Sequence, residues 1–209
     1  MHNAEIIQLS IRLRDSTPVI LRPVLREDRN RLQSGLLQMS SESRYRRFFS
    51  PVRGLSEEQL RYFTEVDQKN HVAWIALDAS SIGLPGIGIA RFVRMKERST
   101  TAEVAFAVID AFQGRGLGTA LLAVLYLMAL ARGIQTLQAV VLAENTKIVS
   151  WLRHLGAHEK FQAEGILKVD LPLQRDLSQL PQNNTARLFA KFLIQFQRDF
   201  CVTKIKHSS

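Results

Sequence analysis

The chain has very little cysteine: Cys201 is the only one among its 209 residues. A single thiol cannot close an internal disulfide, so the fold does not depend on an oxidising compartment. Long apolar runs are also missing, because the most apolar stretch, residues 120–131, is too short to cross a bilayer. Residues 1–16 carry several charges and lack the apolar core of a signal peptide. We therefore expect a cytoplasmic protein with no transmembrane segment.

Acidic side chains are scarce, since 28 Lys and Arg outnumber 19 Asp and Glu, which leaves a formal charge of +9. Such an excess favours either nucleic acid or a phosphate-bearing cofactor. Basic and aromatic residues cluster in one segment: Arg44, Tyr45, Arg46, Arg47, Phe48, Phe49 and Arg53. A nucleic-acid-binding module using these arginines thus competes with a cofactor-binding enzyme, and net charge alone cannot separate them.

Apolar residues make up 46% of the chain, which is enough for one buried core at this length. Hydrophobic periodicity predicts strands at residues 19–23, 71–77, 87–93, 101–109 and 137–142, with a closing hairpin at 158–162 and 166–171 around Glu164-Gly165. It predicts helices at residues 27–40, 57–66, 116–132, 146–155 and 186–200. Ser56 and Gln59 match a capping box for the second helix. Short connections between residues 71 and 109 favour an antiparallel meander.

A glycine-rich loop joins the strand at 101–109 to the long apolar helix. Its sequence is Gln113-Gly114-Arg115-Gly116-Leu117-Gly118. A pyrophosphate needs aligned N–H donors and close backbone approach, which glycine permits, and a helix N-terminus adds its dipole. Arg115 can add a direct charge. Read only as local structure, the loop is a tight strand-to-helix turn. It matches neither the dinucleotide fingerprint Gly-x-Gly-x-x-Gly nor a Walker loop.

These residues resemble the GCN5-related N-acetyltransferase (GNAT) superfamily, whose acetyl-CoA motif is Gln/Arg-x-x-Gly-x-Gly/Ala. The element order from about residue 19 to 171 follows that family, and Asn145 precedes Gly156 by the spacing of its last motif. The resemblance implies a mixed α/β fold, with a mostly antiparallel central sheet and helices on both faces. It implies acetyl-CoA as co-substrate, bound by Ala107, Val108, Ile109, Gln113, Gly114, Arg115, Gly116, Leu117, Gly118, Thr119 and Asn145.

The reaction implied by the resemblance is direct attack of an amine on the acetyl thioester, and the amine must first lose a proton. Glu103 resembles the family's catalytic glutamate, with the small residues Ala105 and Ala107 leaving room on its face of the strand. The alternative for Glu103 is a solvated charge on a half-exposed strand. His71 and His154 have no companion that would define a catalytic pair or a metal site, and we expect no metal.

Two positions are open to more than one interpretation. Asn145 can orient the pantetheine arm of the cofactor or serve as the N-cap of the helix at 146–155. Many relatives have a tyrosine seven residues after this asparagine, which protonates the CoA thiolate. Here that residue is Leu152. The thiolate then leaves without an acid, or takes its proton from water or from another residue.

Ser43 to Phe49 look like the equivalent segment of bacterial protein lysine acetyltransferases of the Pat type. This resemblance implies that Tyr45 and Phe49 pack on the acceptor side, with arginines facing an acidic target. The alternative is a basic connecting loop. We expect a protein lysine as the acceptor amine. A small-molecule amine, or an acyl-CoA-sensing domain without turnover, are the alternatives.

The expected domain spans residues 17–174, after an N-terminal extension at 1–16. Residues 175–209 form a linker and an amphipathic helix bearing Phe189, Phe192, Phe196 and Phe200. An apolar stripe of this kind docks on its own domain or on a second subunit, so a homodimer through this helix is possible.

Overall fold

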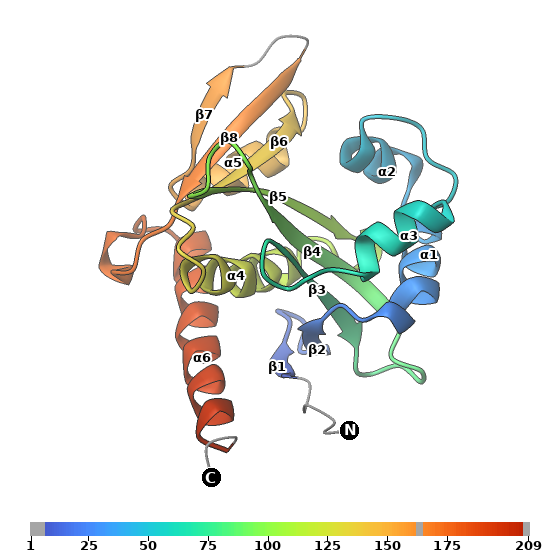
Figure 1. Cartoon of the computed structure of the whole chain (residues 1–209), viewed down its shortest axis with the longest axis horizontal. Coiled ribbons are helices and arrows are strands. Elements are labelled where there is room, and N and C mark those ends of the chain that lie inside the picture. The colour runs from blue at the N-terminus through green and yellow to red at the C-terminus, as the bar shows by residue number, and fades with distance from the viewer. Residues whose placement is uncertain (1–6, 162–164, 207–209) are drawn as a thin grey trace.

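A computed structural model describes residues 7–161 and 165–206, with side chains described for 7–160 and 165–201. One eight-stranded sheet runs through the molecule in the order β1-β2-β3-β4-β5-β6-β8-β7 (Figure 1). Its strands are β1 (Leu9–Arg12), β2 (Pro18–Pro23), β3 (His71–Asp78), β4 (Gly86–Arg94), β5 (Thr101–Val108), β6 (Thr136–Leu142), β7 (His158–Phe161) and β8 (Ile166–Pro172). Only the β5–β6 pair is parallel among these described strands. The predicted mostly antiparallel sheet is confirmed.

Helix α4 (Leu117–Leu130) covers one face of the sheet, and α5 (Thr146–His154) lies on the same side. Helix α4 is apolar on nearly all sides because it is covered on nearly all sides: the sheet lies beneath it and α6 (Asn184–Lys206) lies against it (Figure 1). Phe189, Phe192 and Phe196 of α6 are buried in this core. The phenylalanine stripe therefore docks on the chain's own domain.

Three helices cover the opposite face: α1 (Arg29–Leu37), α2 (Ser41–Phe48) and α3 (Glu57–Thr64) (Figure 1). A buried ion pair anchors this layer to β2, because both oxygens of Asp28 accept hydrogen bonds from Arg22 at 2.6 Å. Asp28 also accepts from the Leu25 amide at 2.9 Å. The chain entering α1 is thereby held to β2.

The described elements match the predicted ones closely and add two. Strand β1 pairs with β2, and α2 occupies most of the basic segment, for which a connecting loop was one of the two alternatives. Ser40 caps α2 by accepting from the Ser43 amide at 3.1 Å. The capping box of α3 is confirmed, with both reciprocal bonds present. Of the predicted turn at Glu164-Gly165, Glu164 lies outside the described residues. Within residues 7–161 and 165–206, no helix has the length and apolar character needed to span a bilayer.

Candidate active site

An opening in the sheet lies between β5 and β6. The two strands pair from Thr101–Thr136 to Val104–Ala139; beyond this point β6 pairs only with β8, and β5 continues to Val108 with no partner on that side. Strand β4 stays paired with β5 along this whole length. The second half of β5 therefore presents one backbone edge with no strand beside it.

The register identifies which backbone groups face this opening. The Ile109 amide donates to the Ile87 carbonyl at 3.1 Å, so odd-numbered residues of β5 bond to β4. By the alternation of a strand, the amides and carbonyls of Phe106 and Val108 turn toward β6. Among the three residues expected to meet the pantetheine arm, Val108 faces the opening while Ala107 and Ile109 face β4. Phe106 lies on the open edge and was not among the sequence candidates.

The N-terminus of α4 lies where β5 ends. The Ala120 amide closes the first turn on the Gly116 carbonyl, which leaves the amides of residues 117–119 without helical partners. Gly114 and Gly116 adopt positive φ of 75° and 95°. A Cβ placed at Gly114 or Gly118 would meet no protein atom within 4 Å. The open space and free donors fit a pyrophosphate, as the glycine loop predicted.

Side chains of the loop are engaged by the protein itself. Arg115 pairs with Asp15 at 2.6 Å, and the Arg14 amide donates to the Arg115 carbonyl at 3.1 Å. The Gln113 amide group donates to the Val108 carbonyl at 3.1 Å and to Ser43 Oγ at 3.2 Å. The side chains of Gln113 and Arg115 therefore stabilise the loop. The donors that remain for a phosphate are backbone amides. The N-terminal segment contributes directly to this stabilisation.

Helix α5 forms the wall of the opening. Trp151 packs edge-on against Phe106 at 5.8 Å and donates to Thr119 Oγ1 at 3.2 Å. Leu152, where many relatives carry a tyrosine, is 2% exposed and belongs to the core. Asn145 Oδ1 accepts from the Ile148 amide at 3.4 Å, which is the N-cap role that the sequence allowed. The side chains of Leu117 and Thr119 are likewise buried, so these two residues offer a ligand at the N-terminus of α4 their backbone amides.

Glu103 is exposed on β5, just before the strands part. It shares a sheet face with Ala105 and Ala107, and its cross-strand partner on β4 is Val93. Because its side chain points to the face covered by α1, α2 and α3, Glu103 lies on the opposite side of the sheet from α4. A base here would meet an acceptor that enters under those three helices.

Two arginine side chains, those of Arg47 and Arg91, lie on the face of the sheet to which Glu103 points. Burial, together with repulsion from Arg91, lowers the pKa of Arg47 to about 10, although Glu103 attracts the charge and opposes this shift. Burial and the nearby Arg91 also lower the pKa of His71 to about 4, against the attraction of Asp67. His71 is thus a neutral ring at pH 7, and its centroid lies 5.1 Å from that of the tilted Tyr62 ring.

Helix α2 is held beside the glycine loop by Asp110, which follows β5. The Asp110 carboxylate accepts from the Ser40 amide at 2.8 Å, from Ser40 Oγ at 2.9 Å and from Ser43 Oγ at 2.8 Å. These bonds lower the pKa of Asp110 in spite of partial burial, which alone would raise it. The candidate acceptor residues are both exposed, Tyr45 within α2 and Phe49 at the position that ends it. Asp110 therefore links the acceptor side to the cofactor side.

Comparison with known proteins identifies the family. The family model described as "Acetyltransferase (GNAT) domain" matches residues 19–158. The acetyltransferase Pat of Mycolicibacterium smegmatis is 38% identical over 171 residues, which cover 81% of this chain and 50% of that protein. The acetyltransferase PA5475 of Pseudomonas aeruginosa is 29% identical over 133 residues, covering 64% of this chain and 71% of the relative. The chain thus spans half the length of its Pat relative.

A solved structure shows the same architecture. The GNAT domain of S. lividans PAT aligns with a TM-score of 0.73 at 33% identity, covering 83% of this chain and all of that domain. Acetyl-CoA is the co-substrate of GNAT acetyltransferases, and the parted strands and open helix N-terminus fit it. The match of the family model, the Pat relative and the solved domain together show that this chain belongs to the GNAT acetyltransferase family.

Proposed function

We propose that this chain transfers the acetyl group of acetyl-CoA to the ε-amine of a protein lysine. One observation carries the proposal: the open edge of β5 leads into the unpartnered amides of α4, while Glu103 is exposed on β5 just before the strands part. This arrangement supports a reaction in which the acyl donor and the base lie along one strand. The catalytic unit comprises residues 17–174, and the flanking segments contribute β1 and α6, which pack on it.

Each part of the site has a role in this reaction. The amides of residues 117–119 and the α4 dipole hold the pyrophosphate, and the backbone of Phe106 and Val108 pairs with the pantetheine amides. Bound acetyl-CoA supplies the activated acyl group. Glu103 removes a proton from the lysine ammonium, so that the nitrogen can form its bond to the acyl carbon as the carbon–sulfur bond breaks.

Acetyl transfer does not require a general acid that protonates the leaving CoA thiolate. A thiol has an ordinary pKa of about 8.5, far below that of an alkoxide's conjugate acid, so the thiolate is a competent leaving group. Leu152 is buried and has no proton to give. Departure as the thiolate, followed by protonation from water, is the course that we propose.

A protein lysine is favoured by the lining of the cavity over β3, β4 and β5. None of its lining residues, all within the described part of the chain, is Asp or Glu. A polyamine or aminoglycoside would need several carboxylates to pair several ammonium groups. The exposed rings of Tyr45 and Phe49 beside this cavity offer a contact surface for a protein target.

Glu103→Gln tests the chemical step. We expect kcat to fall by roughly 100-fold or more, the usual scale for loss of a general base, with unchanged affinity for acetyl-CoA. The matched control is Glu27→Gln, another exposed carboxylate, which lies far along the chain before α1. Release of the CoA thiol and mass measurement of the acetylated product report turnover. Equal turnover of wild type and Glu103→Gln at every pH would remove Glu103 from this role.

The acceptor is tested with a panel of folded proteins beside amino acids, polyamines and aminoglycosides. Transfer only to a small amine would overturn the protein-lysine assignment and leave the acetyl transfer intact. Tight binding of acetyl-CoA with no transfer to any amine would instead favour an acyl-CoA-sensing domain.

A further inference from the structure

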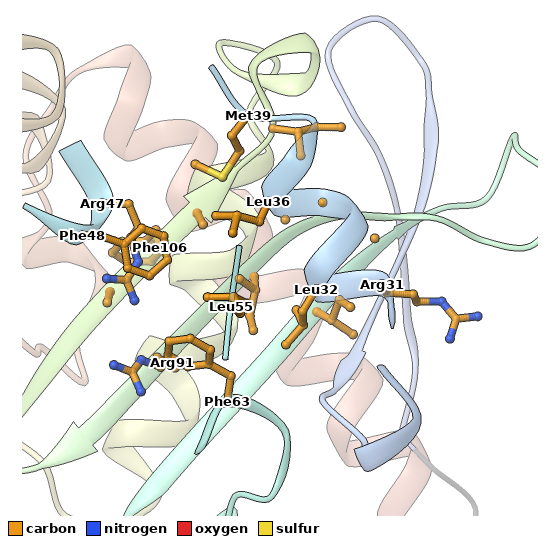
Figure 2. Close-up of a pocket in the computed structure, with 18 residues that line it drawn as sticks. Arg31, Leu32, Leu36, Met39, Arg47, Phe48, Leu55, Phe63, Arg91 and Phe106 are labelled. Carbon is orange, nitrogen blue, oxygen red and sulfur yellow. The ribbon is translucent and has the colours of Figure 1, made fainter. Parts of the chain in front are cut away.

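A cavity on the same sheet face as Glu103 is mostly apolar and has a pair of arginines at one end. It encloses about 60 Å³ between the three helices and the faces of β3, β4 and β5. Leu32, Leu36, Met39 and Leu55 give most of it an apolar lining (Figure 2). Figure 2 shows Arg47 and Arg91 together at one end, with Arg31 at the other end and pointing away. The charge of Arg31 is met by Asp28 at 3.3 Å and by the Leu84 carbonyl at 3.0 Å.

Arg91 is fixed in orientation and poorly compensated. Its guanidinium lies over the rings of Tyr62 and Phe63, at 4.7 and 4.8 Å from their centroids. Within the described residues, its Nε and Nη1 atoms are buried and have no hydrogen-bond partner. Two stacked rings hold an arginine rigidly but do not satisfy its donors. Arg91 is one of the residues that line the cavity.

Arg47 brings a second positive charge to the same place. Its guanidinium lies 5.1 Å from the centroid of the Phe48 ring and faces the cavity from α2. It lies at the same end of the cavity as Arg91 (Figure 2), and Arg91 is in turn the diagonal neighbour of Glu103 across β4 and β5. Two cations thus face one carboxylate. The unbalanced charge attracts a second anion, and the small apolar cavity admits only a small one.

Position along the strands assigns this anion to the acceptor. Arg91 is the cross-strand partner of Ala105, two residues beyond Glu103 on the same face. Diagonal neighbours of this kind lie about 7–8 Å apart. An amine that Glu103 deprotonates therefore lies close enough to Arg91 for a neighbouring group of the same acceptor to reach it. The phosphates, by contrast, bind at the far end of β5, beside α4.

We propose that Arg47 and Arg91 together bind a carboxylate of the acceptor, next to the amine that Glu103 deprotonates. The favoured source is an acidic residue adjacent to the target lysine in a protein, and the α-carboxylate of a free amino acid is the other source of the same chemistry. Planar guanidinium groups suit a carboxylate. The two arginines would bind the acidic side chain of the acceptor while Glu103 acts on the amine of the adjacent lysine. This proposal rests on the role of Glu103 proposed above.

The test compares pairs of lysine peptides that differ only by Asp against Asn, or Glu against Gln, beside the lysine. Wild type is expected to acetylate the acidic member with a kcat/KM roughly 10- to 100-fold higher, the range for a hydrogen bond to a charged group. Arg91→Met and Arg47→Met should each lose that preference on the acidic peptide and retain the rate on its amide twin. Arg187→Gln, an exposed arginine on α6, is the charge-matched control. Arg91→Lys should keep part of the preference.

Binding gives a second measurement that does not depend on turnover. Calorimetric titration of the same peptides, with CoA present, should show the acidic preference in wild type and its loss in Arg47→Met. If the peptides bind with this preference but no peptide is acetylated, the proposed function fails and the carboxylate site stands. Equal affinity and equal kcat/KM for acidic and amide peptides would overturn the site. Efficient acetylation of free amino acids, but not of their amides, would identify the second source.

Discussion

The ion pair of Arg22 and Asp28 gives the sharpest prediction about stability. The Asp28 side chain is fully buried and that of Arg22 is 9% exposed. Burial alone would raise the pKa of Asp28, yet hydrogen bonds from Arg22 and from the Leu25 amide outweigh it and lower the pKa. Asp28→Asn would leave the Arg22 cation buried and uncompensated. Breaking a buried pair in this way costs about 3–5 kcal/mol.

That cost is large against the total stability of a domain, which is about 5–15 kcal/mol. For a chain of this size it corresponds to a Tm lower by roughly 6–20 °C. Urea unfolding followed by the fluorescence of Trp74 and Trp151 measures it. The control is Glu159→Gln, because the Glu159 pair with Arg153 is exposed on the arginine side, where solvent screens the attraction and its loss should change the urea midpoint little.

A double variant separates the pair from its surroundings. Replacing Arg22 and Asp28 together by Met and Leu removes both charges and keeps apolar volume, so most of the stability lost in Asp28→Asn should return. A loss below about 1 kcal/mol in Asp28→Asn would refute the reasoning, because it would mean that the buried guanidinium finds another partner at no cost.

Two further predictions concern the acceptor face. Unfolded histidine takes up a proton as the pH falls below 6.5, while folded His71 stays neutral down to about pH 4. The free energy of unfolding should therefore fall between pH 6.5 and 4. The urea midpoint of His71→Phe should change less across this window than that of wild type. Asp110→Ala removes the acceptor of three bonds from Ser40 and Ser43, so α2 should loosen and raise the KM for the acceptor several-fold while the Kd of acetyl-CoA stays the same; an unchanged acceptor KM would contradict this.

Much of the fold could be predicted because its signals are local. The capping box of Ser56 and Gln59 spans only four consecutive residues, and both of its hydrogen bonds are present. Helix α2 was missed because its arginine-rich sequence has a strongly polar composition, and its clearest signal is the N-cap Ser40. Strand β1 was missed because an alternating pattern over only four residues, Leu9–Arg12, is too short to be distinctive.

The site divides in the same way. The glycine loop could be found from the sequence because its motif is a short-range pattern, whereas Glu103 was selected by resemblance to a family and its role stays a prediction. The pairing of Arg115 with Asp15 joins residues far apart in the chain, and no spacing rule predicts it. The selection of Phe106 and Val108 as the residues on the open edge depends on the register with β4, which a single sequence does not contain. The approach of Arg47 to Arg91 likewise requires the packing of α2 on the sheet.

The central claim is that acetyl-CoA binds in the opening that ends on α4, and Gly118→Val tests it most directly. Gly118 suits the test better than Gly116, whose positive φ of 95° would strain any substitution, because added atoms at Gly118 meet only the space of the ligand. Acetyl-CoA at 100 times its Kd should stabilise wild type by about 2.7 kcal/mol, or roughly 5–11 °C in Tm. Gln197→Val on the exposed side of α6 should respond as wild type does, while Gly118→Val should melt at the same temperature with and without acetyl-CoA. Equal stabilisation of wild type and Gly118→Val by acetyl-CoA would contradict the claim.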